Sequence, residues 1–434
     1  MLIQPKLHIN VRSLAFVLFF GFDMLHSVLK QIIHGNQLPK IIATLILYVV
    51  LFLSIMKKNT IKKDSVFLII GVFILFLLTA IMNPEYRYAM FQLPTWNVYS
   101  SVFTFSSGIF AYLFFRMLDD PDLMMDSLRT ASYITFMWAV LRIISAMRSG
   151  GFQKVFENGK VSTSIYDMSV GYRLLFSSII FFLCFKSKRK KLWYLSLSVV
   201  SAILMVIFGP RSAVASLLMF GILYAVFYQR EIYPDKKIIK NLILMAILCV
   251  GYYTITNKQI MMSLSNVLSN MGLNSRMLDT LVTGNTSLDL GRKRMWTGAI
   301  NMIKEHPILG AGVYADRAAF GIYCHQLILE ILLNFGLVIG VILLGVMFVY
   351  SLKMIAFCEN PKWKLIFIVF FSLTAIRLNV SSSFWQDTNF WACVAIVVNN
   401  YFDEKKQRIE QKSVNEEIDK RIRFVKNKSI GANK

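Results

Sequence analysis

The chain has little charge for its length. Only 16% of its 434 residues are charged, whereas 56% are hydrophobic. A soluble domain of this size cannot bury so much apolar surface, so the composition excludes a soluble globular protein. Uncharged runs such as 41–56, 66–82 and 192–208 approach the ~20 residues that a membrane-spanning helix needs. The sequence therefore predicts an integral membrane protein.

Cysteine and acidic residues are also scarce. The five cysteines form no C-x-x-C pair and lie mostly inside apolar runs, so we expect neither a disulfide framework nor a metal site. Asp and Glu number 24 against 47 Lys and Arg, which gives a net charge of +23. The basic residues form short clusters between apolar runs, as in 186–191, a pattern typical of cytoplasmic loops. We therefore expect no nucleic-acid partner.

The hydropathy pattern predicts an all-α, polytopic protein with about twelve transmembrane helices. We place them near 13–33, 39–56, 66–82, 96–115, 128–148, 168–185, 191–208, 211–228, 239–257, 324–352, 363–380 and 385–402. The first run contains Asp23 and His26 and is followed by no A-x-A-like cleavage site, so we interpret it as a retained span.

An even number of spans places both termini on one side of the membrane. The basic clusters then share that side, which the orientation bias makes the cytoplasm. Only the loop 118–122 is acidic there. We expect residues 1–402 to form the transmembrane domain and 403–434 a basic cytoplasmic tail that contacts anionic membrane lipids.

The large loop between the ninth and tenth spans, 258–323, is expected to lie outside the cytoplasm, beside a shorter loop at 149–167. Asp289 can cap a short amphipathic helix in the large loop, and His306 with Pro307 would end it. The apolar face of this helix is formed by Met295, Trp296, Ala299, Met302 and Ile303. We expect function to reside in this outer region.

Arginines gather at the outer ends of the predicted spans, namely Arg142, Arg173, Arg211 and Arg377. An arginine at the centre of a membrane helix costs ~2.5–3.5 kcal/mol on insertion scales, and less near the interface. A diphosphate at the membrane surface would compensate, because its oxygens suit the planar guanidinium. The alternative is that each arginine reaches the headgroups or pairs with a carboxylate such as Asp167 or Asp387.

Two arginines are the stronger candidates for binding phosphate. Arg211 follows the two-residue turn Gly209-Pro210, which offers no carboxylate of its own. Arg292 lies four residues before Trp296, on the apolar face of the loop helix, where a purely solubilising arginine is not expected. Arg294 points elsewhere and is expected to be a surface charge.

His325 opens the tenth span at its outer boundary. A histidine has a pKa near 6.5 and is well suited to take a proton from a hydroxyl group. A base beside an anion-binding cradle is an active-site combination, so we predict that His325 faces the same cavity as Arg211 and Arg292. Gln326 and Glu330, spaced i and i+4, are expected to bond each other or an acceptor sugar. With Trp296, they complete the predicted site.

Three stretches resemble the O-antigen polymerase and O-antigen ligase superfamily of bacterial envelope polysaccharide enzymes. They are GPRSAVASLLMF (209–220), GRKRMWTGAINMIKEHPILGAGV (291–313) and CHQLILEILLNFGLVIG (324–340). The last is similar to the family pattern H-N-x-x-L-E-x-x-x-x-x-G, with Gln326 where asparagine is commoner. The motifs cover roughly 205–350, and the hydropathy and loop layout are similar over the whole chain.

The resemblance implies an enzyme of the bacterial cytoplasmic membrane that transfers a glycan from a polyprenyl diphosphate at the outer leaflet. It implies inverting glycosyl transfer without a metal or cofactor, and no D-x-D cluster appears in the outer loops. Arg211 and Arg292 would hold the diphosphate, and His325 would act as the base. Arg173 and Arg377 would extend the cradle or bind an anionic sugar. A chain-length regulator could be a partner.

Two alternatives remain open. A polymerase of capsule, exopolysaccharide or O-antigen joins repeat units, whereas a ligase transfers the finished chain to a different acceptor. The Lys-, Asn- and Ile-rich composition favours a low-GC organism and hence a polymerase. A lipid-linked oligosaccharide flippase or transporter would also have many spans with buried charges. The halves of the chain show no repeat and the arginines crowd one leaflet, which argues against transport.

Overall fold

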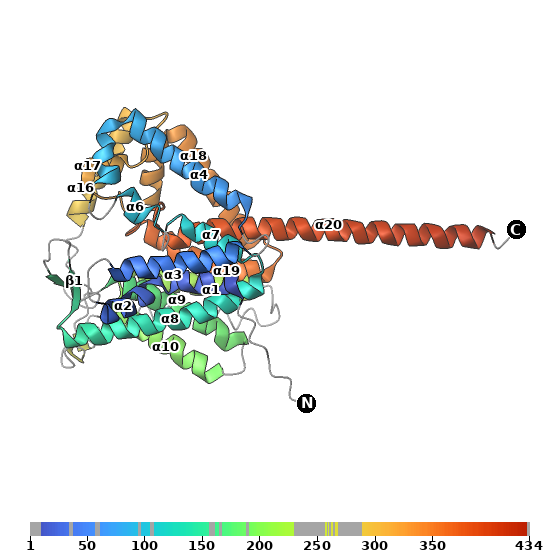
Figure 1. The fold of residues 1–434 in the computed structure, drawn as a ribbon, viewed down its shortest axis with the longest axis horizontal. Coiled ribbons are helices and arrows are strands. Elements are labelled where there is room, and N and C mark those ends of the chain that lie inside the picture. Colours follow the sequence, from blue (N-terminus) through green and yellow to red (C-terminus); the bar gives the residue numbers. More distant parts are fainter. Residues whose placement is uncertain are drawn as a thin grey trace.

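The computed structural model describes residues 10–33, 38–56, 61–93, 97–104, 108–155, 161–164, 167–187, 191–229 and 289–431, with a few isolated positions between 257 and 267. Within these ranges the chain is mainly helical (Figure 1). A small antiparallel hairpin, β1 (Phe152–Val155) with β2 (Val161–Ser164), lies in the predicted loop 149–167, where the sequence indicated no strand.

The described helices and helical turns extend from Val11 to Gly431. In chain order they are α1 (Val11–Phe20), α2 (Phe22–Ile32), α3 (Leu38–Ile55), α4 (Lys63–Met82), the 3-10 turn η1 (Pro84–Tyr86), α5 (Arg87–Phe91), α6 (Val98–Ser101), α7 (Phe110–Met117), α8 (Pro121–Arg148), α9 (Met168–Ser187), α10 (Lys191–Phe208), α11 (Arg211–Leu223), the π-helical turn η2 (Tyr224–Gln229), α16 (Asp289–Glu305), α17 (Ala315–Phe320), α18 (Leu327–Ala356), α19 (Pro361–Leu378) and α20 (Thr388–Gly431).

Six described helices are long and apolar enough to cross a membrane, and α1 with α2, bent by 68°, could form a seventh span. The six are α4, α8, α9, α10, α11 continued to Tyr228, and α18. An all-α, multi-pass membrane protein is therefore the architecture. The predicted span near 239–257 and much of the loop 258–323 lie outside the described residues.

The predicted span 96–115 is not one continuous helix. The structure has two short helices there, α6 and α7. Every side chain of α7 is buried, since α7 packs against α1, α4 and α20. A helix enclosed by protein need not be long enough to cross lipid, and hydropathy alone cannot tell such a core segment from a lipid-facing one.

Large apolar side chains on α3, α4, α10 and the second half of α18 are exposed, among them Phe52, Phe67, Val200 and Val341. The opposite pattern holds for α9 and α19, whose aromatic and aliphatic side chains fill the core. Exposed apolar surface of this extent suits contact with lipid chains.

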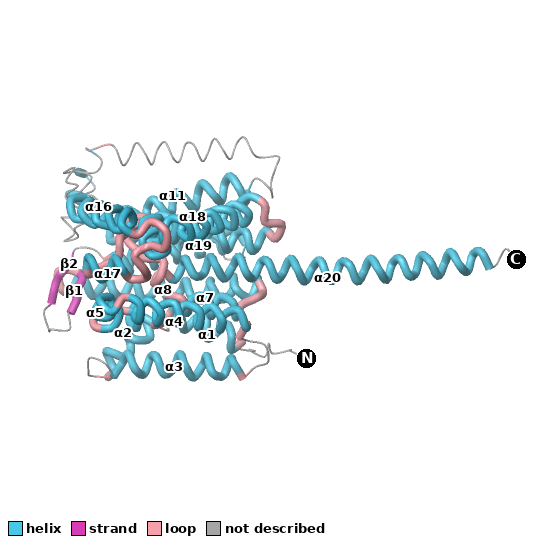
Figure 2. Tube along the Cα trace, turned by 90° about the horizontal axis from the view of Figure 1, so that it is seen from above, coloured by secondary structure: helices cyan, strands magenta, loops and turns pink. Residues whose placement is uncertain are grey.

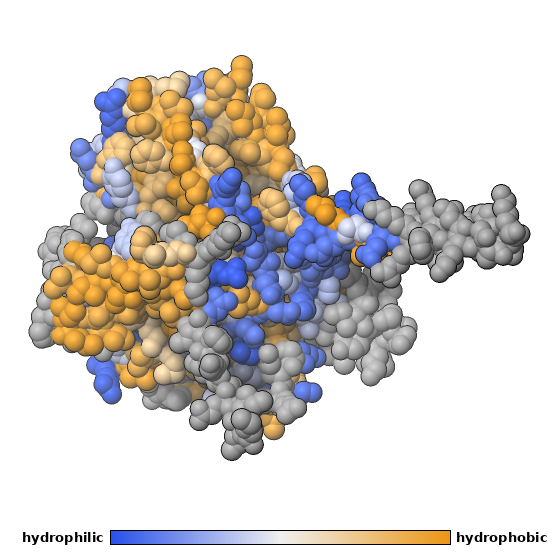
Figure 3. All heavy atoms as spheres, turned by 45° about the vertical axis from the view of Figure 1, so that its right-hand side comes forward, coloured by the Kyte–Doolittle hydropathy of each residue, from blue (hydrophilic) through white to orange (hydrophobic). Residues whose placement is uncertain are grey.

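Basic and acidic side chains pair at one end of the bundle. Arg116 binds Asp64 at 2.7 Å. Asp119 accepts from Lys62 at 2.7 Å and from Arg12 at 3.2 Å. The acidic loop 118–122 thus neutralises basic groups of the same end, which explains why it departs from the basic pattern predicted for this side. Hydrophilic side chains gather here around the base of α20 (Figure 3).

The long helix α20 projects from this end, whereas the β hairpin, α16 and α17 lie at the opposite end (Figures 1 and 2). Successive long helices run in opposite directions, so that alternate connections lie at the same end of the bundle. The described parts of the segments predicted to be extracytoplasmic therefore share one end of the molecule.

Candidate functional site

The loop that follows α16 crosses a break in α18. At Gly336 the backbone leaves the helical conformation, with φ +72°. The break frees two backbone groups, the Leu333 carbonyl and the Leu337 amide. They pair with the Ala311 amide at 2.8 Å and the Pro307 carbonyl at 2.7 Å. Backbone groups at membrane depth need such partners within the protein, so the loop and the broken helix form one unit.

Glycine is required where the two backbones meet. A Cβ at Gly336 would lie 2.2 Å from the Ile308 carbonyl oxygen, and one at Gly310 would lie 2.4 Å from the Gly336 nitrogen. The predicted span 324–352 corresponds to α18, a candidate membrane span, but α18 consists of two half-helices and not of one unbroken helix. A single glycine in an apolar run does not indicate such a break. The backbone groups that pair with the broken helix come from the separate loop around Pro307 and Ala311.

The helix α16 packs against the segment that carries His325. Its bounds, Asp289–Glu305, match the helix predicted to end before His306. Ala299 and Ile303 share a small buried cluster with Cys324. The Trp296 indole nitrogen donates to the Cys324 carbonyl at 3.0 Å. Trp296 therefore fixes α16 next to the segment that carries His325.

His325 lies between the loop and the first half-helix of α18, in a left-handed conformation with φ +57°. Its ring centroid is 4.3 Å from that of Tyr323. Burial, and then the charges of Arg292 and Arg317, lower the pKa of His325 from 6.5 to about 4, although Asp316 opposes the shift. The imidazole is therefore uncharged at neutral pH, the form that can accept a proton.

Arg292 lies close enough to His325 for its charge to act on the imidazole. It makes no hydrogen bond or ion pair with any residue that the structure describes. Arg294, on the same helix, is exposed, as predicted, whereas Arg292 is half-buried. The structure thus places Arg292 within electrostatic range of His325, and the guanidinium has no carboxylate partner among the described residues.

A buried ionic cluster supports the His325 segment, and sequence reasoning missed its centre, Arg317. The Arg317 guanidinium binds Asp316 at 2.8 Å and Glu330 at 2.6 Å. It also donates to the Ser383 hydroxyl at 2.6 Å. Asp316 accepts from the Cys324 amide at 3.1 Å, so the cluster holds the residue that precedes His325. The signal was the pair Asp316-Arg317 inside a largely apolar stretch, where charges are buried only when paired.

Glu330 does not contact the Gln326 side chain. Its carboxylate accepts from Arg317 and from Ser383 and is fully buried. The expected bond between the Gln326 and Glu330 side chains is therefore wrong, because an ion pair outcompetes an amide for a buried carboxylate. Gln326 forms the N-cap of α18 without a side-chain capping bond.

Arg211 opens α11 where the preceding turn meets α9. A Cβ at Gly171 of α9 would lie 2.4 Å from Pro210 Cδ, so the two segments are in close contact. The Tyr172 hydroxyl donates to the Ser212 hydroxyl at 2.7 Å. Arg211 itself is exposed and has no ion pair or hydrogen bond within the described ranges.

A chain of contacts leads from the start of α11 towards His325. The Tyr172 hydroxyl lies 3.3 Å from the Ser381 hydroxyl. The Tyr323 hydroxyl donates to the Ser381 carbonyl at 2.9 Å, and the Tyr323 ring lies next to the His325 ring, tilted by 58°. Arg211 therefore belongs to the same end of the bundle as His325, although no direct contact joins them.

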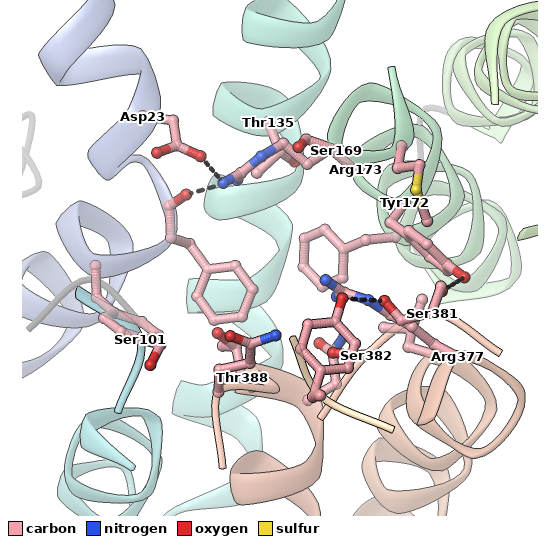
Figure 4. Close-up of a pocket in the computed structure, with 18 residues that line it drawn as sticks. Asp23, Ser101, Thr135, Ser169, Tyr172, Arg173, Arg377, Ser381, Ser382 and Thr388 are labelled. Carbon is pink, nitrogen blue, oxygen red and sulfur yellow. Dashed lines mark hydrogen bonds and ion pairs between the residues drawn. The ribbon is translucent and has the colours of Figure 1, made fainter. Parts of the chain in front are cut away.

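The other predicted arginines have carboxylate partners. Arg142 binds Asp167 at 3.3 Å, and Arg377 Nε lies 3.5 Å from Asp387. Arg173 binds Asp23 of α2, and it also donates to the Phe20 carbonyl at 3.2 Å (Figure 4). The alternative of carboxylate pairing thus holds for these three arginines, whereas Arg211 and Arg292 have no such partner in the described part of the chain.

No group of three or more His, Cys, Asp or Glu side chains in the described part of the chain is arranged to hold a metal ion. The cationic groups instead suit an anionic organic ligand, because guanidinium groups match phosphate oxygens in geometry and charge.

Residues 196–345, which are 150 of the 434 residues, match the family model of O-antigen ligase. Over these residues the chain is similar to the O-antigen polymerase and ligase superfamily. Members of this superfamily are glycosyltransferase-like enzymes that act on lipid-linked glycans. No curated protein and no solved structure matches the chain.

The region that matches the O-antigen ligase model contains His325, the two arginines without a described carboxylate partner, and the buried cluster around Arg317. Arg211, Arg292, Arg317, His325 and Glu330 all lie within 196–345. Arg173 and Arg377 lie outside it. The paired arginines Arg173 and Arg377 thus lie outside the matched region, whereas Arg211 and Arg292 lie within it.

Proposed function

We propose that this protein is a polysaccharide polymerase, which joins polyprenyl-diphosphate-linked repeat units at the outer face of the cytoplasmic membrane. One observation carries the proposal. An uncharged, half-buried His325 lies beside Arg292, and neither Arg292 nor Arg211 has a carboxylate partner among the described residues. A diphosphate supplies the negative charge that this arrangement lacks.

In the proposed reaction, the hydroxyl group of the acceptor sugar attacks the anomeric carbon of the donor. His325 takes the proton of that hydroxyl, the new glycosidic C–O bond forms, and the C–O bond to the diphosphate breaks. The electron pair leaves with the polyprenyl diphosphate. Attack from the face opposite the leaving group inverts the anomeric carbon, so no covalent enzyme intermediate is required.

Arg211 and Arg292 stabilise the negative charge that grows on the diphosphate as the bond breaks. Fixed cations in a partly buried site act strongly on such charge. With its charge stabilised in this way, the diphosphate can leave without a general acid. Because the donor itself carries the leaving group, neither a nucleotide sugar nor ATP is required outside the cytoplasm.

The proposal assigns the end with α16 and α17 to the extracytoplasmic side and the end with paired charges to the cytoplasm. Both termini then lie in the cytoplasm, and the tail 403–434 contacts anionic lipids. A chain-length regulator is a candidate partner of such an enzyme.

Ligation is the second candidate function, because the matched family model is that of O-antigen ligase. A ligase would use the same donor and the same base with a different acceptor. Gel analysis of a deletion strain separates the two functions: loss of a polymerase leaves single repeat units, whereas loss of a ligase leaves long chains that are not transferred.

Transport of a lipid-linked oligosaccharide fits less well. A transport path needs polar groups along its length, whereas the charges at the α20 end pair with one another, as Arg116 does with Asp64. Activity with substrate supplied only from the outer side of sealed vesicles would support the enzyme.

The direct test uses purified protein in lipid nanodiscs with a synthetic lipid-linked repeat unit. His325→Ala and Arg211→Ala should each abolish chain extension, while Arg294→Ala, a matched surface arginine of α16, should keep it. Melting temperatures near that of the wild type show that the variants are folded. Full activity of both His325→Ala and Arg211→Ala would disprove the mechanism.

A further inference from the structure

A separate cavity of about 450 Å³ lies next to the proposed site. Its walls come from the bend between α1 and α2, from α8, α9 and α19, and from the segment that leads into α20 (Figure 4). The volume falls within the range of about 300–1,000 Å³ that is usual for small-ligand sites. Nothing in the proposed reaction has used this cavity so far.

The lining is rich in groups that form hydrogen bonds. Hydroxyl and amide side chains come from several elements, namely Ser101, Thr135, Ser169, Ser381, Ser382, Gln386, Thr388 and Asn389. The rings of Phe20, Tyr172 and Tyr323 lie among them. Lipid chains would favour an apolar lining, whereas sugars combine many hydroxyl groups with apolar ring faces. The lining therefore matches a carbohydrate.

The charges in this cavity balance. Arg173 is paired with Asp23, and both line the cavity. Arg377, which lies over the Tyr172 ring, faces Asp387. Asp387 Oδ1 accepts from the Thr374 hydroxyl at 2.9 Å, which directs the other oxygen towards Arg377. Two neutralised pairs offer donors and acceptors to hydroxyl groups but no excess charge for a phosphate or a carboxylate.

The cavity approaches the proposed base through Tyr323. Tyr323 lines it, and the ring of Tyr323 lies 4.3 Å from that of His325. A sugar held against Tyr323 would therefore bring one of its ring hydroxyl groups close to the imidazole. The group that His325 deprotonates belongs to the acceptor, so the acceptor is the substrate that this position suits.

We propose that this cavity binds the acceptor sugar, and that the sugar is uncharged, with hydroxyl or acetamido groups. The proposal rests on the proposed function and replaces the expectation that Arg173 and Arg377 extend the diphosphate cradle or bind an anionic sugar. Gln386 and Asn389 select the acceptor through their amide groups.

The test compares Gln386→Leu and Asn389→Leu with Asn379→Leu. Leucine keeps the approximate size and removes the amide, and Asn379 is an exposed asparagine at the end of α19 outside the cavity. The probes are the lipid-linked repeat unit as donor, the oligosaccharide released from it by mild acid as soluble acceptor, and undecaprenyl diphosphate alone. We expect the KM for the soluble acceptor to rise at least tenfold in both cavity variants, with kcat and the Kd for undecaprenyl diphosphate unchanged.

Three results separate this inference from the proposed function. An unchanged acceptor KM in both cavity variants, with wild-type chain extension intact, would overturn the cavity assignment alone. Weaker binding of undecaprenyl diphosphate in those variants would also overturn it, since the cavity would then hold the donor. A wild-type protein that binds the oligosaccharide but extends no chain, with binding lost in the cavity variants, would support the cavity and refute the polymerase.

Discussion

The two ends of the helix bundle use charged residues in different ways. At the end from which α20 projects, the cations are paired, as in Arg116 with Asp64 and Lys62 with Asp119. At the opposite end, Arg211 and Arg292 have no such partner within the described ranges, and His325 is kept uncharged. The first end uses its charges to hold loops together. The second leaves cations available for an anionic ligand.

The largest effect is expected at the base. His325→Ala should lower the rate of chain extension by about 10²–10⁴-fold, the usual contribution of a general base. The measurement is the initial rate with purified protein and a lipid-linked repeat unit. A loss of less than a few-fold would mean that another group takes the proton.

Disruption of the buried ionic cluster around Arg317 should lower the stability of the protein as well as its activity. Arg317→Leu leaves Asp316 and Glu330 buried without a cation, and breaking a buried ion pair costs about 3–5 kcal/mol. Denaturant unfolding of the purified variant measures this loss. Unchanged stability would show that the cluster does not hold the His325 segment.

The next effect in size is expected for the arginines that have no carboxylate partner among the described residues. Arg211→Ala and Arg292→Ala should each reduce kcat by about 10²–10³-fold, as removal of a group that stabilises transition-state charge does. The matched control is Arg12→Ala at the other end, where Arg12 is already paired with Asp119. Equal losses at the two ends would remove the distinction between them.

A shift in pH dependence is a finer test. Protonation inactivates the base, so the wild-type rate should fall on the acid side near the His325 pKa of about 4. Arg292→Gln removes a positive charge that lowers this pKa, so the acid limb of the rate should move to higher pH. Arg294→Gln should leave the limb in place. An unmoved limb in Arg292→Gln would separate Arg292 from the base.

The smallest effect is expected for stability at the α20 end. Arg12→Ala breaks a partly exposed pair, which contributes about 0–1 kcal/mol. Unfolding in denaturant would check this value. A loss as large as that of Arg317→Leu would mean that the end with paired charges is as important to the fold as the buried cluster.

Local pattern was enough to predict some of the site. The helix over Asp289–Glu305 follows from a periodic apolar face and a proline-bounded end, and the same periodicity placed Arg292 inward and Arg294 outward. These features depend on residues that are near one another in the chain. The grouping of the basic clusters on the cytoplasmic side stays a prediction, because clusters such as 236–237 lie outside the described residues.

Long-range features were beyond such reasoning. The partners of Arg317 include Ser383, which lies 66 residues away. The break at Gly336 exists because the loop around Pro307 fills it, and the short helix α7 is apolar because it lies in the core. The same composition would fit a continuous lipid-facing helix, so sequence alone cannot choose between them.

The central claim is that Arg211 and Arg292 grip one diphosphate beside His325. The most direct measurement is an experimental structure of the full chain in nanodiscs with undecaprenyl diphosphate bound. The account predicts phosphate oxygens within hydrogen-bond distance of both guanidinium groups, on the same side of the bundle as His325. A diphosphate bound at the α20 end, or one that contacts neither arginine, would contradict it.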